Sequence, residues 1–231
     1  MVAVGGQAIP LWLSGSRPSW FPQELDWIVG CTYKGLPVET LNLEPRTLNL
    51  ERRTQNLEPG TLNLEHRTIR NVPGCNMAFR REVFDKVGGF RSEMGGLGET
   101  PRGGEEANLC LRIKHEMPDA LVLYQPNALI RHKVPHRRLR LRYIARRSYN
   151  EGFYKSIVER LSPTSTQQTL STQQTLSTEY SYLRYILFTS IPGRLRYFYN
   201  KGSLSQVGAI IISLIATGTG YLLGRLKVGR A

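Results

Sequence analysis

The strongest constraint on the fold is an uncharged stretch near the C-terminus, residues 202–224. Its densest part, residues 207–223, holds seven Ile and Leu residues. A helix needs about 20 mostly apolar residues to cross a bilayer core about 30 Å thick. We therefore expect a single-pass transmembrane helix over 202–224. A buried core helix is the alternative that the pattern leaves open.

The segment just before it, residues 180–201, mixes aromatic and aliphatic residues with Arg184, Arg194 and Arg196. This mixture predicts an interfacial helix, broken at Pro192. Basic residues flank the apolar stretch on both sides, so the positive-inside rule does not select an orientation. Because Met1 to Leu13 does not resemble a secretory signal, we expect the globular part to be cytoplasmic.

Two biased tracts interrupt the rest of the chain. Residues 40–67 repeat a TLNLEPR-like heptad, with a decayed copy over 68–74, but the leucine gaps alternate between two and five and prolines intervene. This spacing excludes a coiled coil and predicts an exposed loop insert over 40–70, with a stacked solenoid as an outside alternative. Residues 165–178 repeat STQQTL without charge, and the tract predicts a low-complexity linker over 161–179.

The charge balance points to anionic partners. Lys and Arg outnumber Asp and Glu by 31 to 18, which gives a net charge of +13. Nucleic acid, lipid headgroups and phosphorylated substrates all fit this balance. No nucleic-acid recognition motif is present, so we expect no nucleic-acid partner. The three cysteines have neither CxxC nor zinc-ligand spacing, which favours a reducing compartment.

The part between the two tracts carries the chemical motifs. Helical spacing predicts helices over 82–87 and 107–114, and residues 120–124 predict a short buried strand. Glycines from Gly88 to Gly104 predict a mobile loop of the kind that closes over ligands. The motifs are GCNMAFRREVFDKVGGF from Gly74, GGEEANLCLRI from Gly103 and RHKVPHRR from Arg131.

In their order and spacing these motifs resemble the acceptor half of inverting family 2 glycosyltransferases of the GT-A type. The resemblance covers residues 4–155 once the heptad insert is removed. It implies an α/β fold: a partial, Rossmann-like GT-A domain over 1–39 and 71–160, followed by the membrane segment. It also implies transfer of a sugar from a nucleotide-sugar donor to a lipid-linked or cell-surface glycan acceptor, as in polysaccharide biosynthesis.

The resemblance places the catalytic base at Glu106, the second acid of the pair that opens the helix, with Glu105 positioning the acceptor or the loop. An inverting transfer needs one carboxylate to take the proton of the acceptor hydroxyl while its oxygen attacks the anomeric carbon. This chain has Glu where the family more often has Asp. The alternative is that both acids only complement the helix dipole.

Further site residues follow from the same motifs. His132 is the candidate ligand of a divalent cation, Mg or Mn, with a polar surface residue as the alternative. Arg137 and Arg147 belong to an arginine run that meets the donor diphosphate or a lipid phosphate, or else faces solvent or membrane. Trp20 and Trp27 stack on sugar or lipid, or pack in the core. Asn76, with Gly74, binds acceptor hydroxyls, or caps a helix over 77–87.

Family members also have a nucleotide-binding half with an Asp-x-Asp motif. The aspartates of this chain are Asp26, Asp85 and Asp119, so no Asp-x-Asp is present. We therefore expect a truncated chain with impaired activity alone, and a separate chain that supplies the nucleotide-binding half. The alternative function is a non-catalytic, membrane-anchored basic protein that binds anionic lipid.

Overall fold

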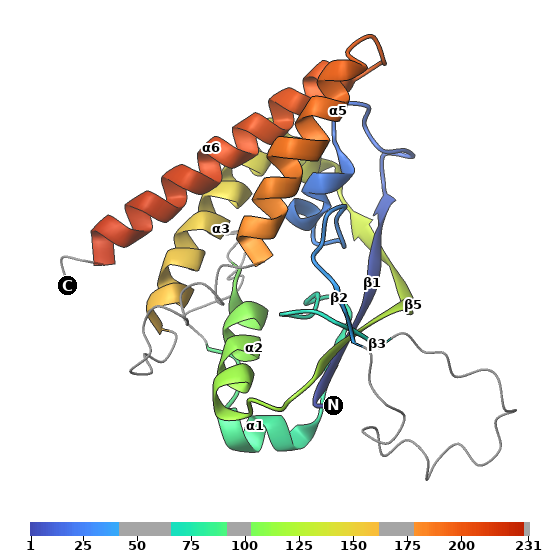
Figure 1. The fold of residues 1–231 in the computed structure, drawn as a ribbon. Helices are drawn as coiled ribbons and strands as arrows, with labels where there is room; N and C mark the ends of the chain where they lie inside the picture. The colour runs from blue at the N-terminus through green and yellow to red at the C-terminus, as the bar shows by residue number, and fades with distance from the viewer. Residues whose placement is uncertain (42–65, 92–102, 162–177, 229–231) are drawn as a thin grey trace, which may run out of the picture.

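The structure is a computed structural model that describes residues 1–41, 66–91, 103–161 and 178–228. These residues form a mixed α/β fold with one sheet, and the helices lie along one side of it (Figure 1). The expected mobile loop lies largely at residues 92–102, and most of the heptad insert lies at residues 42–65, outside the described residues.

The sheet has five strands in the order β2-β3-β5-β1-β4. Its two long central strands, β1 (Ala3–Trp12) and β5 (Val122–Val134), are parallel. The short strands β4 (Met77–Phe79), β3 (His66–Thr68) and β2 (Glu39–Leu41) all pair antiparallel to their neighbours. The mixed α/β class is therefore confirmed. The Rossmann-like GT-A assignment stays a prediction, because the described sheet has a single parallel pair.

A bulge between the two central strands explains the glycine at position 6. The register shifts between Gly6 and Gln7, and the amide nitrogen of Asn76 donates to the carbonyls of Gln7, at 3.0 Å, and Ala128, at 2.7 Å. A Cβ atom on Gly6 would lie 2.1 Å from the Ala128 carbonyl oxygen, so no larger residue fits there. Asn76 thus bridges the sheet, and the expectation that it caps a helix is wrong.

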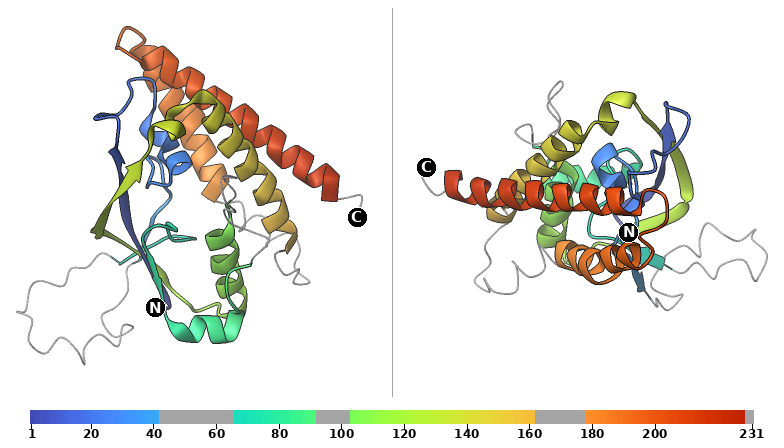
Figure 2. Two further views of the ribbon diagram at one scale, coloured as in Figure 1. Left: turned by 180° about the vertical axis from the view of Figure 1, so that it is seen from behind. Right: turned by 90° about the horizontal axis from the view of Figure 1, so that it is seen from above.

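The helices lie at two ends of the sheet. The short α1 (Arg81–Val87) and α2 (Glu105–Glu116) lie near the N-terminus of β1, and η1 (Gln23–Val29) and η3 (His136–Leu139) lie near the other end (Figure 1). The long helices are α3 (Leu141–Leu161) and α6 (Ser203–Val228). Seen from behind, α6 forms the outer edge of the molecule, away from β1 and β5 (Figure 2).

Residues 178–196 form one further helical segment. Residues 178–185 continue into a wide π turn, η4 (Ile186–Ser190), and then into α5 (Ile191–Arg196). The expected break at Pro192 is therefore wrong: the chain stays helical, and the wide turn lies before the proline. A proline inside a helix lacks a hydrogen-bond donor and clashes with the preceding turn, and a π turn relieves that conflict.

A buried ion pair fixes this segment to η1. Glu24 is fully buried, and its carboxylate accepts hydrogen bonds from Arg194, at 2.7 Å and 3.1 Å, and from Ser190, at 2.9 Å. Removing one partner of such a pair leaves an uncompensated buried charge, which costs about 3 to 5 kcal/mol. The segment from 178 to 196 is therefore held firmly against the early part of the chain.

The main core cluster lies between the sheet end and the long helices. It contains Phe21, just before η1, together with Leu25, Ile28, Val134, Ile144, Ile186 and Ile210 from η1, β5, α3, η4 and α6. A second cluster joins the sheet to α2 and includes Ala3, Ile69, Val72, Cys110 and Val122. Ile69 and Val72 lie in the decayed repeat, so the folded part begins at β3, earlier than the expected insert boundary at residue 70.

The helices α3 and α6 run parallel and pack closely. The Ser148 and Ser213 hydroxyl oxygens are 2.9 Å apart, and a Cβ atom on Gly152 would lie 1.9 Å from the Thr217 carbonyl oxygen. A Cβ atom on Gly220 would lie 2.0 Å from the Tyr149 carbonyl oxygen. Small residues allow such close backbone approach.

Among the described residues, α6 is the helix long and apolar enough to cross a membrane, judged by length and composition over Ser203–Leu226. Of its most apolar part, 33% is buried inside the protein. The other predicted elements are also present, although the strand expected over 120–124 is the start of the much longer β5.

Candidate active site

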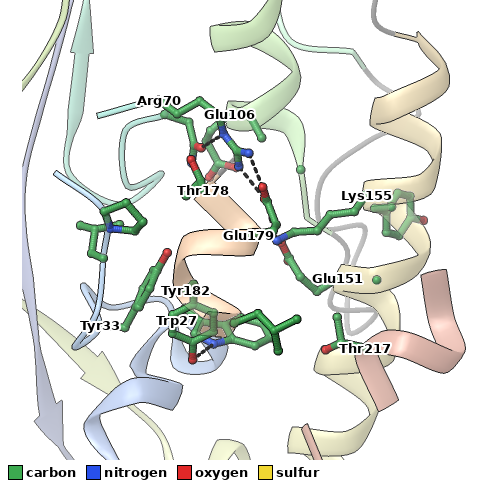
Figure 3. A pocket seen from close by; sticks show the side chains of 18 of the residues that line it. Trp27, Tyr33, Arg70, Glu106, Glu151, Lys155, Thr178, Glu179, Tyr182 and Thr217 are labelled. Carbon is green, nitrogen blue, oxygen red and sulfur yellow. Dashed lines mark hydrogen bonds and ion pairs between the residues drawn. The ribbon is translucent and has the colours of Figure 1, made fainter. Parts of the chain in front are cut away.

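A cavity of about 530 Å³ lies between α2, α3, α6 and the helix that begins at residue 178 (Figure 3). Its volume is in the range of about 300 to 1,000 Å³ that is common for small-molecule sites. The wall is mostly apolar with a few charged groups. Its polar and aromatic lining includes Trp27, Arg70, Glu106, Arg147, Glu151, Lys155, Glu179 and Tyr182.

Glu106, in the first turn of α2, is the acid of the cavity wall that is best suited to act as a catalytic base. Its carboxylate lies against Gly74, since a Cβ atom on that glycine would be only 1.7 Å from Glu106 Oε1. Burial, and then the neighbouring charge of Glu105, raise the pKa of Glu106 from 4.5 to about 7. At neutral pH this carboxyl group is close to half ionised and can both take and return a proton.

Glu105 lies beside Glu106 but does not line the cavity. Its Oε2 atom is buried and has no hydrogen-bond partner among the described residues. A buried carboxylate oxygen without a partner is costly, and its negative charge contributes to the raised pKa of Glu106. Within the described part of the chain, Glu105 therefore acts on its neighbour rather than on the cavity.

A chain of ion pairs crosses the cavity wall. Arg147 donates to Glu151 at 2.7 Å, and Lys155 lies 3.5 Å from Glu151 and 2.9 Å from Glu179. Glu179 also accepts two hydrogen bonds from Arg70, at 2.5 Å and 2.7 Å. Figure 3 shows Arg70 and Lys155 approaching Glu179 from opposite sides. The network joins three segments: the loop that follows β3, the helix α3 and the helix that begins at residue 178.

Aromatic side chains form the opposite wall. The Trp27 indole nitrogen donates to the Tyr182 hydroxyl at 3.3 Å, and that hydroxyl donates to the Glu24 carbonyl at 2.6 Å. The Arg147 guanidinium lies over the Trp27 ring at 5.7 Å. These contacts connect the aromatic wall to the ion-pair chain, and they leave Trp27 facing the cavity (Figure 3).

The structure brings together four of the residues singled out from the sequence: Gly74, Glu106, Trp27 and Arg147 line one cavity. The others lie outside its wall, namely Glu105, Asn76, Trp20, Arg137 and His132. Trp20 packs edge-to-face on Phe21 at 5.7 Å, so its ring contributes to the core. Arg137 is exposed on η3.

The surroundings of His132 do not fit a divalent cation. Its Nε2 atom lies 3.2 Å from a guanidinium nitrogen of Arg138, and burial together with that positive charge lowers its pKa. Within the described residues, no three His, Cys, Asp or Glu side chains gather in a metal-binding arrangement. The metal-ligand role of His132 stays a prediction.

Sequence reasoning missed much of the cavity wall. Arg70 and Glu179 border the two biased tracts, where no motif marks them, and their meeting depends on the folding of distant segments. Glu151 and Lys155 had a readable signal. Together with Arg147 they follow at intervals of four residues, which places all three on one face of a helix.

One comparison with known proteins gives a significant similarity. The chain is similar to the glucosyl-dolichyl phosphate glucuronosyltransferase of Haloferax volcanii: the two are 29% identical over 228 residues, or 97% of this chain and 61% of the relative. The chain thus spans about three fifths of that relative's length. The similarity supports a glycosyltransferase. No protein-family profile matches the chain, and no solved structure is significantly similar to it.

Proposed function

We propose that this chain carries the acceptor site and the catalytic base of an inverting glycosyltransferase. The proposal rests on the carboxyl group of Glu106. This group is partly buried, lies against Gly74 in the cavity wall and has a pKa raised to about 7. The relative is named for transfer to a dolichyl phosphate carrier, so the proposed acceptor is a lipid-linked sugar. The proposed donor is a nucleotide sugar.

In this mechanism the acceptor hydroxyl lies beside Glu106. The carboxylate takes the hydroxyl proton while the oxygen forms a bond to the anomeric carbon, and the bond from that carbon to the nucleotide diphosphate breaks on the opposite face. Trp27 offers an aromatic face to the acceptor sugar. Arg147, held by Glu151 and close to Glu106, contributes positive charge on the donor side.

The donor side is proposed to be completed elsewhere. The sequence has no Asp-x-Asp pair, and the described residues hold no cluster suited to a metal ion. We propose that a nucleotide-binding half outside residues 1–231 supplies both. The proposal therefore separates acceptor binding, assigned to this chain, from donor binding.

The test measures acceptor binding and transfer with the full chain in detergent. A short-chain glucosyl polyprenyl phosphate should quench the fluorescence of Trp27 and should do so equally well in wild type and Glu106→Gln. Trp27→Phe should remove the quench, whereas Trp20→Phe should keep it, because Trp20 packs outside the cavity. No quench in the wild type, or an undiminished quench in Trp27→Phe, contradicts the acceptor site.

Transfer is measured by the mass of the lipid product, with a nucleotide-activated uronic acid as donor and membranes that also contain the proposed partner half. Glu106→Gln should reduce transfer by at least about a hundredfold, since general-base catalysis contributes about 10² to 10⁴. The matched variant Glu82→Gln changes an exposed acid on α1 and should transfer normally. Equal rates for both variants contradict the role of Glu106.

A second function, non-catalytic binding of anionic lipid, is favoured by one observation. Arg137, Arg140, Arg142 and Arg146 are all exposed on η3 and α3. Vesicle binding that survives Glu106→Gln but is lost on reversing these four charges, together with no acceptor binding in the cavity, would support it over the transferase.

A further inference from the structure

The outer face of α6 is apolar and has no partner within the described protein. Leu204, Ile215, Leu222 and Leu226 expose between 58% and 67% of their surface. The helical segment before α6 also exposes a large apolar side chain, Phe188, with 76% of its surface accessible. Exposed apolar surface of this extent marks an interaction site, either for another protein or for a membrane.

The opposite face of α6 is fastened to α3 by specific contacts. Besides the close approach at Gly152 and Gly220, the Tyr221 hydroxyl donates to Glu159 at 2.5 Å, and a Cβ atom on Gly224 would lie 2.1 Å from the Ser156 hydroxyl oxygen. These contacts, with the Ser148–Ser213 pair, run along most of the apolar part of α6. In this structure the two helices therefore form one closely packed unit.

This pairing conflicts with α6 crossing a bilayer upright. The part of α3 beside residues 213–224 carries Glu151, Lys155 and Glu159, and the cavity with its ion pairs lies next to it. An upright α6 would bring these charges to the depth of the hydrocarbon core, where charged groups are strongly disfavoured. A helix that lies flat keeps α3 and the cavity on the aqueous side.

The charges around the apolar face fit a negatively charged membrane surface. Residues 180–231 contain no Asp or Glu. Arg184, Arg196, Lys201 and Arg225 are all exposed on or beside the helices that carry the apolar face. Basic residues that flank an apolar helix face are the pattern of interfacial helices on anionic lipid.

We propose that α6 and the segment 178–196 lie in the plane of an anionic lipid surface, with α6 docked on α3, so that the chain binds the membrane from one side without crossing it. The apolar faces enter the headgroup boundary, and the exposed cations contact lipid phosphates. The cavity, whose wall includes Leu214 and Thr217 of α6, then lies just above the membrane plane. This inference does not depend on the transferase proposal.

A cysteine pair tests the docking of α6. The double variant Ser148→Cys/Ser213→Cys places thiols where the hydroxyls are 2.9 Å apart, and it should form an intramolecular disulfide in intact membranes under mild oxidation. The control Ser148→Cys/Thr219→Cys uses an exposed position of the same helix and should not. Failure of the first pair to cross-link in membranes overturns the proposal.

A C-terminal epitope tag tests the topology of the same full-length chain. In sealed vesicles, added protease should cut the tag and a tag placed before Met1 together, since both lie on one side. Protection of the C-terminal tag alone shows a membrane pass and overturns the proposal. This outcome leaves the transferase proposal untouched, because acceptor binding in the cavity is measured separately.

Flotation tests the lipid contact. The chain should float with vesicles of phosphatidylcholine and phosphatidylglycerol and bind less to phosphatidylcholine alone. Ile215→Asn and Leu222→Asn should each weaken binding about tenfold, whereas Thr219→Asn, a polar exposed control, should not. Equal flotation of all three variants overturns the assignment of this face.

Discussion

Replacing Glu106 with Gln should make the protein more stable at neutral and alkaline pH, although it removes the proposed base. The carboxyl group lies partly buried beside Glu105, in surroundings that disfavour its charge. Gln has nearly the same shape and remains neutral at every pH. Groups arranged for catalysis often reduce stability in this way.

The size of the effect follows from the pKa of Glu106, which is raised from 4.5 to about 7. Below pH 4.5 the group is protonated in both folded and unfolded protein, so wild type and variant should have the same pH dependence. Between pH 4.5 and 7 the unfolded chain releases the proton while the folded protein keeps it. The wild type should lose about 3 kcal/mol relative to the variant over this window, and the difference should stay constant above it.

The assay is the free energy of unfolding, from denaturant titration in detergent, at matched pH values from 4 to 9 (about one unit apart). Glu82→Gln, at an exposed acid on α1, serves as the control and should show almost no pH-dependent difference. A stability difference between Glu106→Gln and wild type that is flat across this range would contradict the prediction. So would a wild type that becomes more stable relative to the variant as pH rises, because that sign means cations hold the carboxylate of Glu106 in its charged form.

Other substitutions probe the same cavity. Gly74→Ala should fold, because the new Cβ meets the movable end of Glu106, but displacement of that carboxylate should slow transfer at least about tenfold. Glu179→Gln should cost about 3 kcal/mol of unfolding free energy at pH 7, because its two cations outweigh burial and lower its pKa to about 2. That cost should vanish as pH falls from 4.5 to 2, and a pH-independent cost would contradict it. Thiol labelling of the folded chain should modify only the exposed Cys75. The buried Cys31 and Cys110 should react only after the chain is unfolded, and mass spectrometry counts the labelled thiols in each case.

Two kinds of signal could be read from the sequence. The motifs that resemble those of family 2 glycosyltransferases singled out Gly74, Glu106 and Arg147, and all three line the cavity. Apolar periodicity predicted helices over 82–87 and 107–114, and the structure has them as Arg81–Val87 and Glu105–Glu116. Such local signals do not need knowledge of the tertiary fold.

The remaining parts of the site depend on contacts between distant segments. Arg70 meets Glu179 across 109 positions of sequence, and both lie at the edges of biased tracts that carry no motif. Asn76 satisfies two carbonyls at a strand bulge, and no sequence pattern announces a register shift. His132 lies beside the guanidinium of Arg138 because β5 leads into η3, and the chain folds back there toward the end of β5.

The membrane segment shows the limit of counting apolar residues. A span of about 20 such residues meets the requirement for crossing, yet Ser213, Thr217, Gly220 and Gly224 recur at intervals of three or four, which is the spacing of a helix-packing face. Counted by composition, these small residues are compatible with a helix surrounded by lipid. In the structure, however, each of them contacts α3. The charge of the partner helix limits how deeply a packed pair can enter the bilayer, and α3 carries Glu151, Lys155 and Glu159 beside residues 213–224 of α6. The position of α6 in the membrane is thus a property of the pair, and a sequence window confined to α6 does not contain it.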